Sequence, residues 1–309
     1  MLEHDYVIEA ALDAGFDVCG VAESGPVDPA LRSHFAERME RGCYGTMEWL
    51  GRHADMRFDP GRLMEGARSV VVCGKGYPLY GVGASVASYA MGEDYHRTLR
   101  RRLEGLCDAL VKGGAHLVRP FVDSAPVAER YWAVRAGLGA IGQSGMVINS
   151  SLGGAFLICG VVTDAVCDCY DTPSAYSPCV GCGRCVASCP SGAIEGRGVI
   201  DASKCRSYLT IEHRGALSSS QAEAVRNGTT VFGCDVCLKV CPHNSMTEAP
   251  IPPPFDMEAR QWLDVGSGRF KREYGHTPMS RISVAMLRRN AALVSGMDVA
   301  GATSEAEHP

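Results

Sequence analysis

The stretch CVGCGRCVASCP, residues 179–190, decides how this chain folds, because its four cysteines have to converge on shared centres. They are separated by two, two and three residues, and the last one precedes a proline. In bacterial ferredoxins this spacing places three thiolates on one four-iron cluster, while the fourth binds a neighbouring cluster. A second set follows at Cys205, Cys234, Cys237 and Cys241. The region therefore has enough thiolates for two [4Fe-4S] clusters.

The two sets predict a definite division of the ligands. We assign one cluster to Cys179, Cys182, Cys185 and Cys241. We assign the other cluster to Cys189, Cys205, Cys234 and Cys237. Adjacent clusters of this kind pass single electrons toward another reactive centre. We therefore interpret the protein as a redox enzyme that carries its own electron path.

Structural zinc and disulfides also use clustered cysteines. Zinc sites usually take two separated Cys-x2-Cys pairs and do not need a further cysteine followed by proline. Disulfide-rich chains are usually small secreted domains. This chain has 309 residues, and its start, MLEHD, lacks the basic region of a secretory leader. Iron–sulfur clusters therefore explain the cysteines better than either alternative.

The composition is that of a globular protein, with 46% hydrophobic residues and a formal net charge of −5. This charge argues against indiscriminate nucleic-acid binding but leaves room for a local basic patch. The longest apolar run, residues 155–162, is far too short to span a bilayer. We expect a cytoplasmic monomer without a membrane span. Solvated helix faces are the simpler interpretation of two basic sets: Arg97, Arg100, Arg101 and Arg102, and Lys271, Arg272, Arg281, Arg288 and Arg289.

Residues 1–165 alternate between helical and strand-like patterns, which favours an α/β (α+β) domain with helices covering a sheet. Residues 69–74 and 117–122 predict strands, and the first is apolar enough to be central. Residues 93–112 predict a helix with one apolar face, formed by Leu99, Leu103, Leu106 and Leu110.

The next helix is expected to open at Pro126, because proline fits the first helical turn. The glycines of residues 136–142 then end it. We expect three parts in the chain: a catalytic domain at 1–165, a ferredoxin-like two-cluster domain at 166–246, and a C-terminal part at 247–309. The last part is predicted to hold a stiff linker at 250–254, a helix at 282–294 that packs back on the body, and a frayed tail.

Asp123 follows the second predicted strand and precedes a helix. Ends of strands are where sheets with helical covers often place their ligands. The carboxylate could cap the following helix, since Asp favours such positions. It could equally be a proton donor that faces a bound cofactor.

Several stretches together carry a likeness to one family. In the first half they are YGTMEWL at 44–50, MRFDP at 56–60, DYH at 94–96, VDSAPV at 122–127 and RAGLGAIG at 135–142. Later they are CRSYLTIE at 205–212, GCDVC at 233–237, CPHN at 241–244 and RRN at 288–290. With this combination the chain resembles the epoxyqueuosine reductase family, which is related to the corrinoid reductive dehalogenases.

The resemblance implies a nitroreductase-like sheet domain that binds base-off cobalamin, joined to a two-cluster ferredoxin-like domain. Electrons from an external low-potential donor would pass through the clusters to cobalt, and epoxyqueuosine in tRNA would become queuosine. Asp123 matches the position of the family's proton donor. That role fits the reaction, because an opened epoxide leaves an alkoxide that needs a proton. Burial beneath the corrin would raise the pKa of that carboxyl. The cobalamin-binding positions implied are Arg57, Asp123, Val147, Ile158 and Ser207.

The chain departs from the family's usual residues at Gln143-Ser144-Gly145-Met146 and at Gly153-Gly154-Ala155. We expect both stretches near the cofactor and substrate pocket. Close members of the family carry a lysine where this chain has Gln143, and its absence would remove a phosphate-binding cation. The chain also ends soon after Asn290, without the helical-repeat domain that some members append. Two alternatives stay open: a dehalogenase-like corrinoid reductase of another small electrophile, and a ferredoxin-type electron-transfer protein.

The remaining cysteines are predicted to be small core residues, because free cysteine is commonly buried: Cys19, Cys43, Cys73, Cys107 and Cys159. Cys167 and Cys169 could supply an extra ligand or a redox pair, but a linker is the simpler interpretation. His96 is interpreted as a surface or capping histidine, although it could approach the active site.

Overall fold

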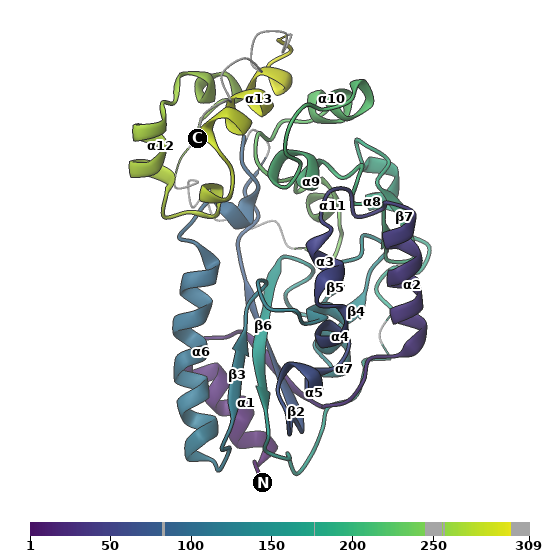
Figure 1. Cartoon of the computed structure of the whole chain (residues 1–309), viewed down its shortest axis with the longest axis vertical. Helices are drawn as coiled ribbons and strands as arrows, with labels where there is room; N and C mark the ends of the chain where they lie inside the picture. Colours follow the sequence, from purple (N-terminus) through teal and green to yellow (C-terminus); the bar gives the residue numbers. More distant parts are fainter. Residues whose placement is uncertain (82–83, 176, 245–254, 256, 298–309) are drawn as a thin grey trace.

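A four-stranded sheet forms the base of the molecule (Figure 1). The computed structural model describes residues 1–81, 84–175, 177–244, 255 and 257–297. The strand order is β1-β2-β6-β3, and every neighbouring pair is antiparallel. The strands are β1 (Val18–Glu23), β2 (Ser69–Gly76), β3 (Val118–Phe121) and β6 (Phe156–Thr163). The predicted α+β sheet domain is confirmed.

The predicted central strand, β2, lies between β1 and β6, and its residues Ser69 to Gly74 are all buried. One row across the sheet is made of cysteines, because Cys73 is paired with Cys19 on β1 and with Cys159 on β6. Burial raises the pKa of the Cys73 and Cys159 thiols well above the usual value, so both stay protonated. The expectation of core cysteines is confirmed for this pair and for Cys43; Cys19 and Cys107 are partly buried.

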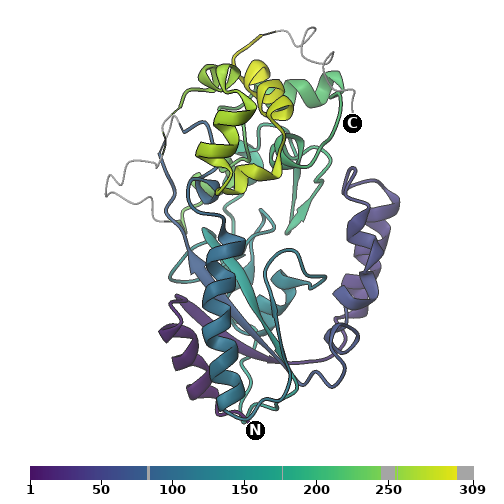
Figure 2. The same cartoon turned by 60° about the vertical axis from the view of Figure 1, so that its left-hand side comes forward.

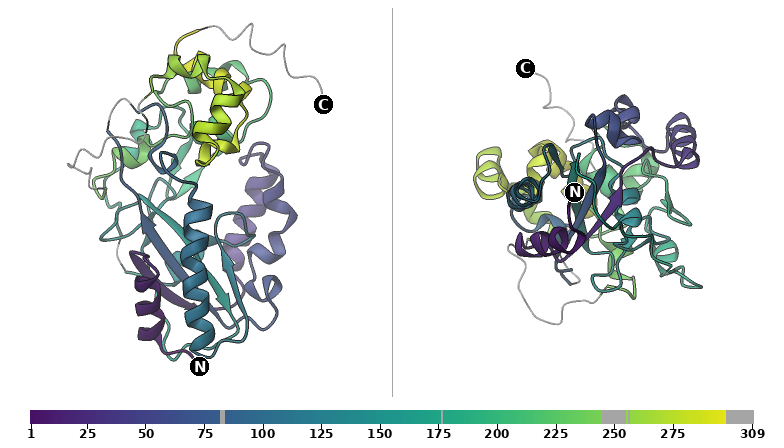
Figure 3. Two further views of the ribbon diagram at one scale, coloured as in Figure 1. Left: turned by 90° about the vertical axis from the view of Figure 1, so that its left-hand side faces the viewer. Right: turned by 90° about the horizontal axis from the view of Figure 1, so that it is seen from below.

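Two helices, α1 (His4–Asp13) and α6 (Tyr95–Lys112), cover one face of the sheet, as the left view of Figure 3 shows. The Asp94 carboxylate caps α6 by accepting the His96 backbone N–H at 3.0 Å. The four leucines predicted to share a face are at most 1% exposed and pack against the sheet. The predicted helix is confirmed, and it starts two residues later than expected.

Truncation of this leucine face should destabilise the sheet domain. Leu103→Ala removes a side chain that is 0% exposed, so we expect a loss of about 2–5 kcal/mol in the free energy of unfolding. Val111→Ala on the same helix is the control, since Val111 is 49% exposed. Denaturant titration of the two variants checks this, and equal midpoints would contradict the assigned packing.

The opposite face of the sheet packs against α7 (Glu129–Arg135), whose Trp132 and Ala133 are buried, together with Phe58 and Leu63. Pro126 does not open α7, contrary to the prediction: it lies in the turn before, and the helix begins at Glu129. The N–H of Val127 donates to the carbonyl of Ala125, so the chain makes a tight turn first. Gly137 then has a φ of +72°, which ends the helix as predicted.

Short helices between β1 and β2 form an arm at one side of the molecule (Figure 2). They are α2 (Pro29–Glu40), α3 (Trp49–Arg52), α4 (Ala54–Arg57) and α5 (Pro60–Leu63). Arg38 of α2 is buried and donates to the Ile200 carbonyl, so the arm is tied to the cysteine-bearing segment.

The cysteine-bearing segment has short elements only. Two short strands form a separate small sheet. They are β4 (Ala140–Ile141) and β5 (Val147–Ile148), which pair with each other. The segment itself has a hairpin and four helices: β7 (Ile194–Gly196), β8 (Val199–Ile200), α8 (Arg184–Ser188), α9 (Arg206–Ile211), α10 (Ser219–Arg226) and α11 (Val236–Lys239).

A C-terminal helical layer covers the upper part of the molecule in Figure 1. Its elements are η2 (Ala259–Asp264), α12 (Ser267–Tyr274), η3 (Pro278–Arg281) and α13 (Val284–Val294). They share a core with residues 84–91, where the 3-10 helix η1 (Ser88–Ala90) lies, and Trp262 is fully buried there. The predicted helix at 282–294 is confirmed and packs on the body. The predicted linker at 250–254 and the tail from 298 lie outside the described residues.

No helix in the described part of the chain is long and apolar enough to cross a membrane.

Candidate functional site

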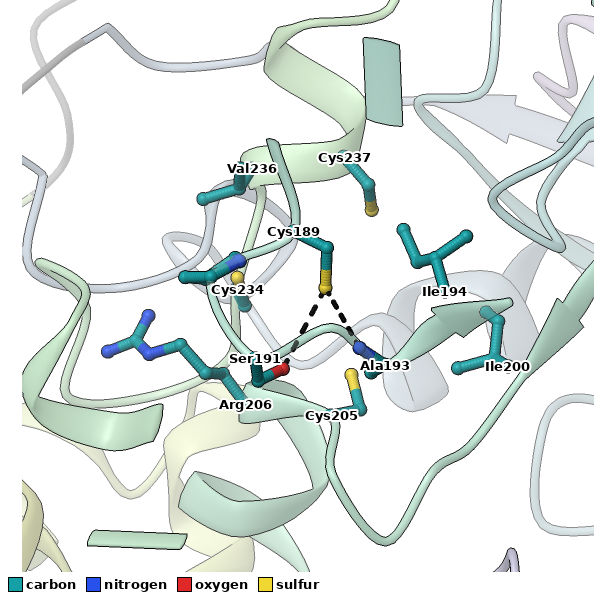
Figure 4. Close-up of a pocket in the computed structure, with 11 residues that line it drawn as sticks. Cys189, Ser191, Ala193, Ile194, Ile200, Cys205, Arg206, Cys234, Val236 and Cys237 are labelled. Atoms are coloured by element: carbon teal, nitrogen blue, oxygen red, sulfur yellow. Dashed lines mark hydrogen bonds between the residues drawn. The ribbon is translucent and has the colours of Figure 1, made fainter. Parts of the chain in front are cut away.

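Two neighbouring hollows collect the clustered cysteines. Figure 4 shows one of them, into which the thiols of Cys189, Cys205, Cys234 and Cys237 point. The second hollow is lined by Cys179, Cys182, Cys185 and Cys241, with Cys237 between the two. The structure thus brings together the same two sets of four that the spacing predicts. The assignment of individual ligands stays a prediction.

The surroundings of these thiols suit iron–sulfur clusters. Burial and the nearby Cys234 and Cys205 thiolates raise the pKa of Cys237, so four anionic sulfurs would repel one another without bound iron. Burial also opposes ionisation of Cys189, but the backbone N–H groups of Ser191 and Ala193 lower its pKa overall. The Ala193 N–H donates to the Cys189 Sγ at 3.3 Å. Such N–H···S bonds are a known means of tuning cluster potentials.

Of the two stretches that depart from the family's usual residues, the first lies against the second hollow. The Gln143 N–H donates to the Cys179 Sγ at 3.3 Å, and Ser144 also lines that hollow. The Gly154 N–H donates to Asn244 Oδ1 at 2.6 Å, and a Cβ on Gly153 would lie 2.2 Å from that same oxygen. Gln143 thus contacts a cysteine of the second hollow, and Gly153 and Gly154 contact the turn after Cys241. The expectation that both stretches lie near the cofactor and substrate pocket stays a prediction.

Loss of one thiol should empty one hollow. Cys234→Ser is expected to lower the iron content from about eight to about four per chain, because a four-iron cluster needs its full ligand set. The exposed Cys169 offers the control Cys169→Ser, which should keep all the iron. Iron and sulfide quantitation after anaerobic reconstitution checks both; an unchanged content in Cys234→Ser would refute its assignment.

Cys167 and Cys169 line neither of the two hollows. Cys167 is buried in the core beneath α1 and pairs with Leu2 in an isolated bridge. Cys169 is exposed nearby. The possibility of an extra ligand is therefore wrong for Cys167.

Asp123 lies at the end of β3, where its carboxylate meets two aromatic side chains from the start of α6. The Tyr95 hydroxyl donates to Asp123 Oδ2 at 2.8 Å. His96 Nε2 lies 3.2 Å from the same oxygen, and its Nδ1 lies 2.8 Å from Asp94 Oδ1. The interpretation of His96 as a surface or capping residue is therefore wrong, because its ring bridges two carboxylates beside the candidate proton donor.

The expected raised pKa of Asp123 is not produced by the protein's own groups. The hydrogen bond with His96 holds the pKa of Asp123 below its usual value, against the effect of burial and with the help of Tyr95. The same bond, with a contribution from Asp94, raises the pKa of His96. The pair therefore holds one proton between Nε2 and Oδ2 over a wide pH range.

Glu129, the first residue of α7, is a second carboxyl at this site that the sequence analysis did not single out. Its Oε1 accepts the backbone N–H of Asp123 at 2.6 Å. Burial, followed by the negative charge of Asp123, raises the pKa of Glu129 from 4.5 to about 8. Glu129 lies six residues after Asp123 and two residues beyond the quoted VDSAPV stretch. No local pattern points to it, because only the turn brings it to the Asp123 backbone.

The raised pKa of Glu129 predicts a pH-dependent stability. A carboxyl whose pKa is higher in the folded state contributes stability that is complete below 4.5 and is lost as pH rises through about 8. Glu129→Gln should therefore have the wild-type melting temperature near pH 5 and a melting temperature several degrees higher near pH 9. Thermal unfolding at both pH values checks this, with the exposed Glu65→Gln as control. A constant difference across pH would contradict the raised pKa.

The other predicted cofactor contacts come from different elements. Arg57 ends α4; its Nε is buried without a hydrogen-bond partner among the described residues, and one of its terminal nitrogens donates to the Val127 carbonyl at 3.4 Å. Val147 on β5 is buried on the same side of the sheet, where Ile158 on β6 packs half-buried. Ser207 is half-buried on α9, two residues after Cys205. A buried arginine nitrogen without a partner is a fitting donor for a polar group of a bound cofactor.

Most side chains of the two basic sets already have hydrogen-bond or ion-pair partners within the protein. Arg101 pairs with Glu93, Arg102 donates to the carbonyls at the end of α1, and Arg272 pairs with Glu273. Arg281 makes two hydrogen bonds to the Glu212 carboxylate, at 2.8 and 2.9 Å, and Arg289 is buried. The exposed members of the two sets are Arg97, Arg100, Arg101, Lys271, Arg272, Arg281 and Arg288.

A family model described as a 4Fe-4S double cluster binding domain matches residues 178–244. With the sheet domain and its polar site, this match defines the class: an iron–sulfur oxidoreductase with two clusters. A second model, described as epoxyqueuosine reductase QueG, DUF1730, matches residues 57–124. The chain belongs to the epoxyqueuosine reductase family. It is 35% identical over 308 residues to the epoxyqueuosine reductase of Cyclobacterium marinum, which covers 94% of this chain and 97% of that protein.

Other relatives agree. The epoxyqueuosine reductase of Escherichia coli K12 is 31% identical over 329 residues, covering 96% of this chain and 84% of that one. A solved epoxyqueuosine reductase with an epoxyqueuosine-modified tRNA-Tyr stem loop is 25% identical, with a TM-score of 0.83, covering 94% of this chain and 80% of that chain. The Bacillus subtilis enzyme, also 25% identical with a TM-score of 0.81 and the same coverage, was solved with its catalytic aspartate loop swung out of the active site.

Proposed function

We propose that this protein reduces epoxyqueuosine in tRNA to queuosine, with cobalamin as its second cofactor. The reaction consumes two electrons and two protons and releases the epoxide oxygen as water. The observation that carries the proposal is the Asp123, His96 and Tyr95 contact at the end of β3, in a chain that belongs to the family and has a double-cluster domain. These three side chains form a site that could donate a proton, in the domain next to the cluster-binding segment that would supply electrons.

The electron path has an inner and an outer end. Cys182 of the second hollow is exposed, so its cluster would accept electrons from an external low-potential donor. The first hollow includes Cys205, which directly precedes α9 with the proposed cofactor residue Ser207. Cys237 lines both hollows, so clusters bound in them would be neighbours, as electron transfer between them requires.

Four groups of this chain would hold the cobalamin. The unpartnered Arg57 Nε and the Ser207 hydroxyl would bind its polar groups, and the backbones of Val147 and Ile158 would lie against the ring. When bound, cobalamin would supply a cobalt centre that takes electrons singly from the clusters and reduces the epoxide. Arg57 is well suited to bind a neutral or anionic group, because a guanidinium stays cationic at neutral pH even where burial lowers its pKa.

Proton supply falls to the chain's own side chains. The proton shared between His96 Nε2 and Asp123 Oδ2 would pass through Asp123 to the oxygen of the opening epoxide, which becomes a strong base as the carbon–oxygen bond breaks. His96, hydrogen-bonded to the same Oδ2, would be the source of that proton and would take up another from solvent afterwards. The hydrogen bond with Asp123 raises the pKa of His96, which favours the protonated ring that this step requires. Tyr95 would keep the carboxyl oriented, since its hydroxyl bonds the same oxygen.

Removal of the carboxyl should stop turnover and spare the cofactors. Asp123→Ala is expected to keep about eight iron atoms per chain and an EPR signal of base-off cob(II)alamin. It should lower kcat by about 100-fold or more, the range of general acid catalysis. Asp13→Ala, at the exposed end of α1, is the matched control.

The assay is anaerobic reconstitution with iron, sulfide and cobalamin, followed by reaction with epoxyqueuosine tRNA and nucleoside analysis by mass spectrometry. Normal turnover by Asp123→Ala would refute its role. Bound cobalamin without queuosine formation by the wild type would favour reduction of another electrophile. Clusters without cobalamin binding would favour an electron-transfer protein.

A further inference from the structure

Asp123 has an unusual backbone. Its φ is +51°, and among the described residues the only other non-glycine residue with a positive φ is Arg197. This conformation is disfavoured for a residue with a Cβ, and its occurrence at a candidate active site is a common sign of function. The N–H and the hydroxyl of Ser124 both donate to the Val122 carbonyl, so the chain folds tightly around Asp123.

A turn of this kind leaves the N–H of its central residue without a partner inside the turn. Here Glu129 supplies that partner, since its Oε1 accepts the Asp123 N–H at 2.6 Å. Glu129 is itself fixed, because it begins α7 and the helix is anchored by Trp132 and Ala133, which are 2% and 0% exposed. The strained turn is thus tied to a rigid helix by one side-chain hydrogen bond.

The surroundings of Glu129 show that stability alone does not explain its presence. It is partly buried next to the like charge of Asp123, an arrangement that disfavours its ionised form. The charged or titratable groups that face it come from the loop, from α4, α6 and α7, and from β6: Asp123, Arg57, Tyr95, Arg130 and Cys159. A carboxyl kept in such a place usually has a task at the site.

We propose that Glu129 is a positioning residue, whose hydrogen bond to the Asp123 N–H holds the Asp123 turn in the conformation where the carboxyl meets His96 and Tyr95. The inference rests on the proposed function, in which Asp123 is the proton donor. We call the hydrogen bond from the Asp123 N–H to Glu129 Oε1 the latch, because it would hold the turn that carries this donor. Release of the latch frees the strained turn to relax and carries the carboxyl away from both partners.

Three substitutions separate the hydrogen bond from the charge. Glu129→Gln keeps an acceptor oxygen at the same reach and should retain kcat within about threefold. Glu129→Ala has no acceptor, and Glu129→Asp keeps the charge but is one methylene shorter. Both should lower kcat about 10- to 100-fold with KM within about twofold, because a catalytic group displaced by about 1 Å loses rate in this range. Glu65→Ala, at an exposed site, is the control.

Hydrogen exchange by mass spectrometry supplies a second readout that does not need turnover. The peptide that spans Asp123 should contain one additional fast-exchanging amide in Glu129→Ala and Glu129→Asp, while Glu129→Gln resembles the wild type. Iron content and melting temperature show whether each variant is folded. This comparison holds even if the wild type fails to act on epoxyqueuosine, so a failed proposed function and a failed latch are distinguishable.

Two results would overturn the latch. Wild-type kcat and wild-type exchange in Glu129→Ala would show that the hydrogen bond does not hold the turn. A kcat in Glu129→Gln as low as in Glu129→Ala would show that the carboxyl takes part in proton transfer, which the latch does not require.

Discussion

Eight thiols from a stretch of 63 residues have to meet in two adjoining hollows, and much of the upper molecule is arranged around that requirement. The helices that deliver them are short: α8 has five residues and α11 has four. Helices of this length are unstable by themselves in water. They contact each other, and bound iron would supply cohesion that the small local core does not, because metal binding to such sites contributes folding free energy.

The sheet domain supplies what the clusters cannot, which is an acid site with a fixed geometry. Both faces of the sheet are covered, by α1 and α6 on one side and by α7 on the other, so polar groups gather where β3 ends. There Asp123 from the loop meets Tyr95 and His96 from the start of α6. The well-packed leucine face of α6 holds those two side chains in place, which links core packing to the site.

The neighbouring carboxyls of Asp123 and Glu129 have opposite environments. Hydrogen bonds from His96 and Tyr95 favour the charged form of Asp123, whereas burial and the charge of Asp123 favour the neutral form of Glu129. Environments that push two pKa values apart commonly mark acid and base functions. Here the separation lets Asp123 serve as the proton-transfer group while Glu129 remains a hydrogen-bond acceptor for its backbone.

The sequence by itself determined the cluster-binding segment, because ligand spacing is a local property and cysteine has few other uses at that density. It also determined β2, β3, α6 and α13, whose apolar periodicity is strong. Only the tertiary structure decided that His96 and Glu129 meet Asp123, since these contacts depend on a turn with positive φ and on the packing of α6 and α7. It also decided that Gln143 lies against Cys179 and that α7 starts at Glu129 rather than at Pro126. Periodicity and spacing report which residues share an element; contacts between elements depend on how the whole chain packs.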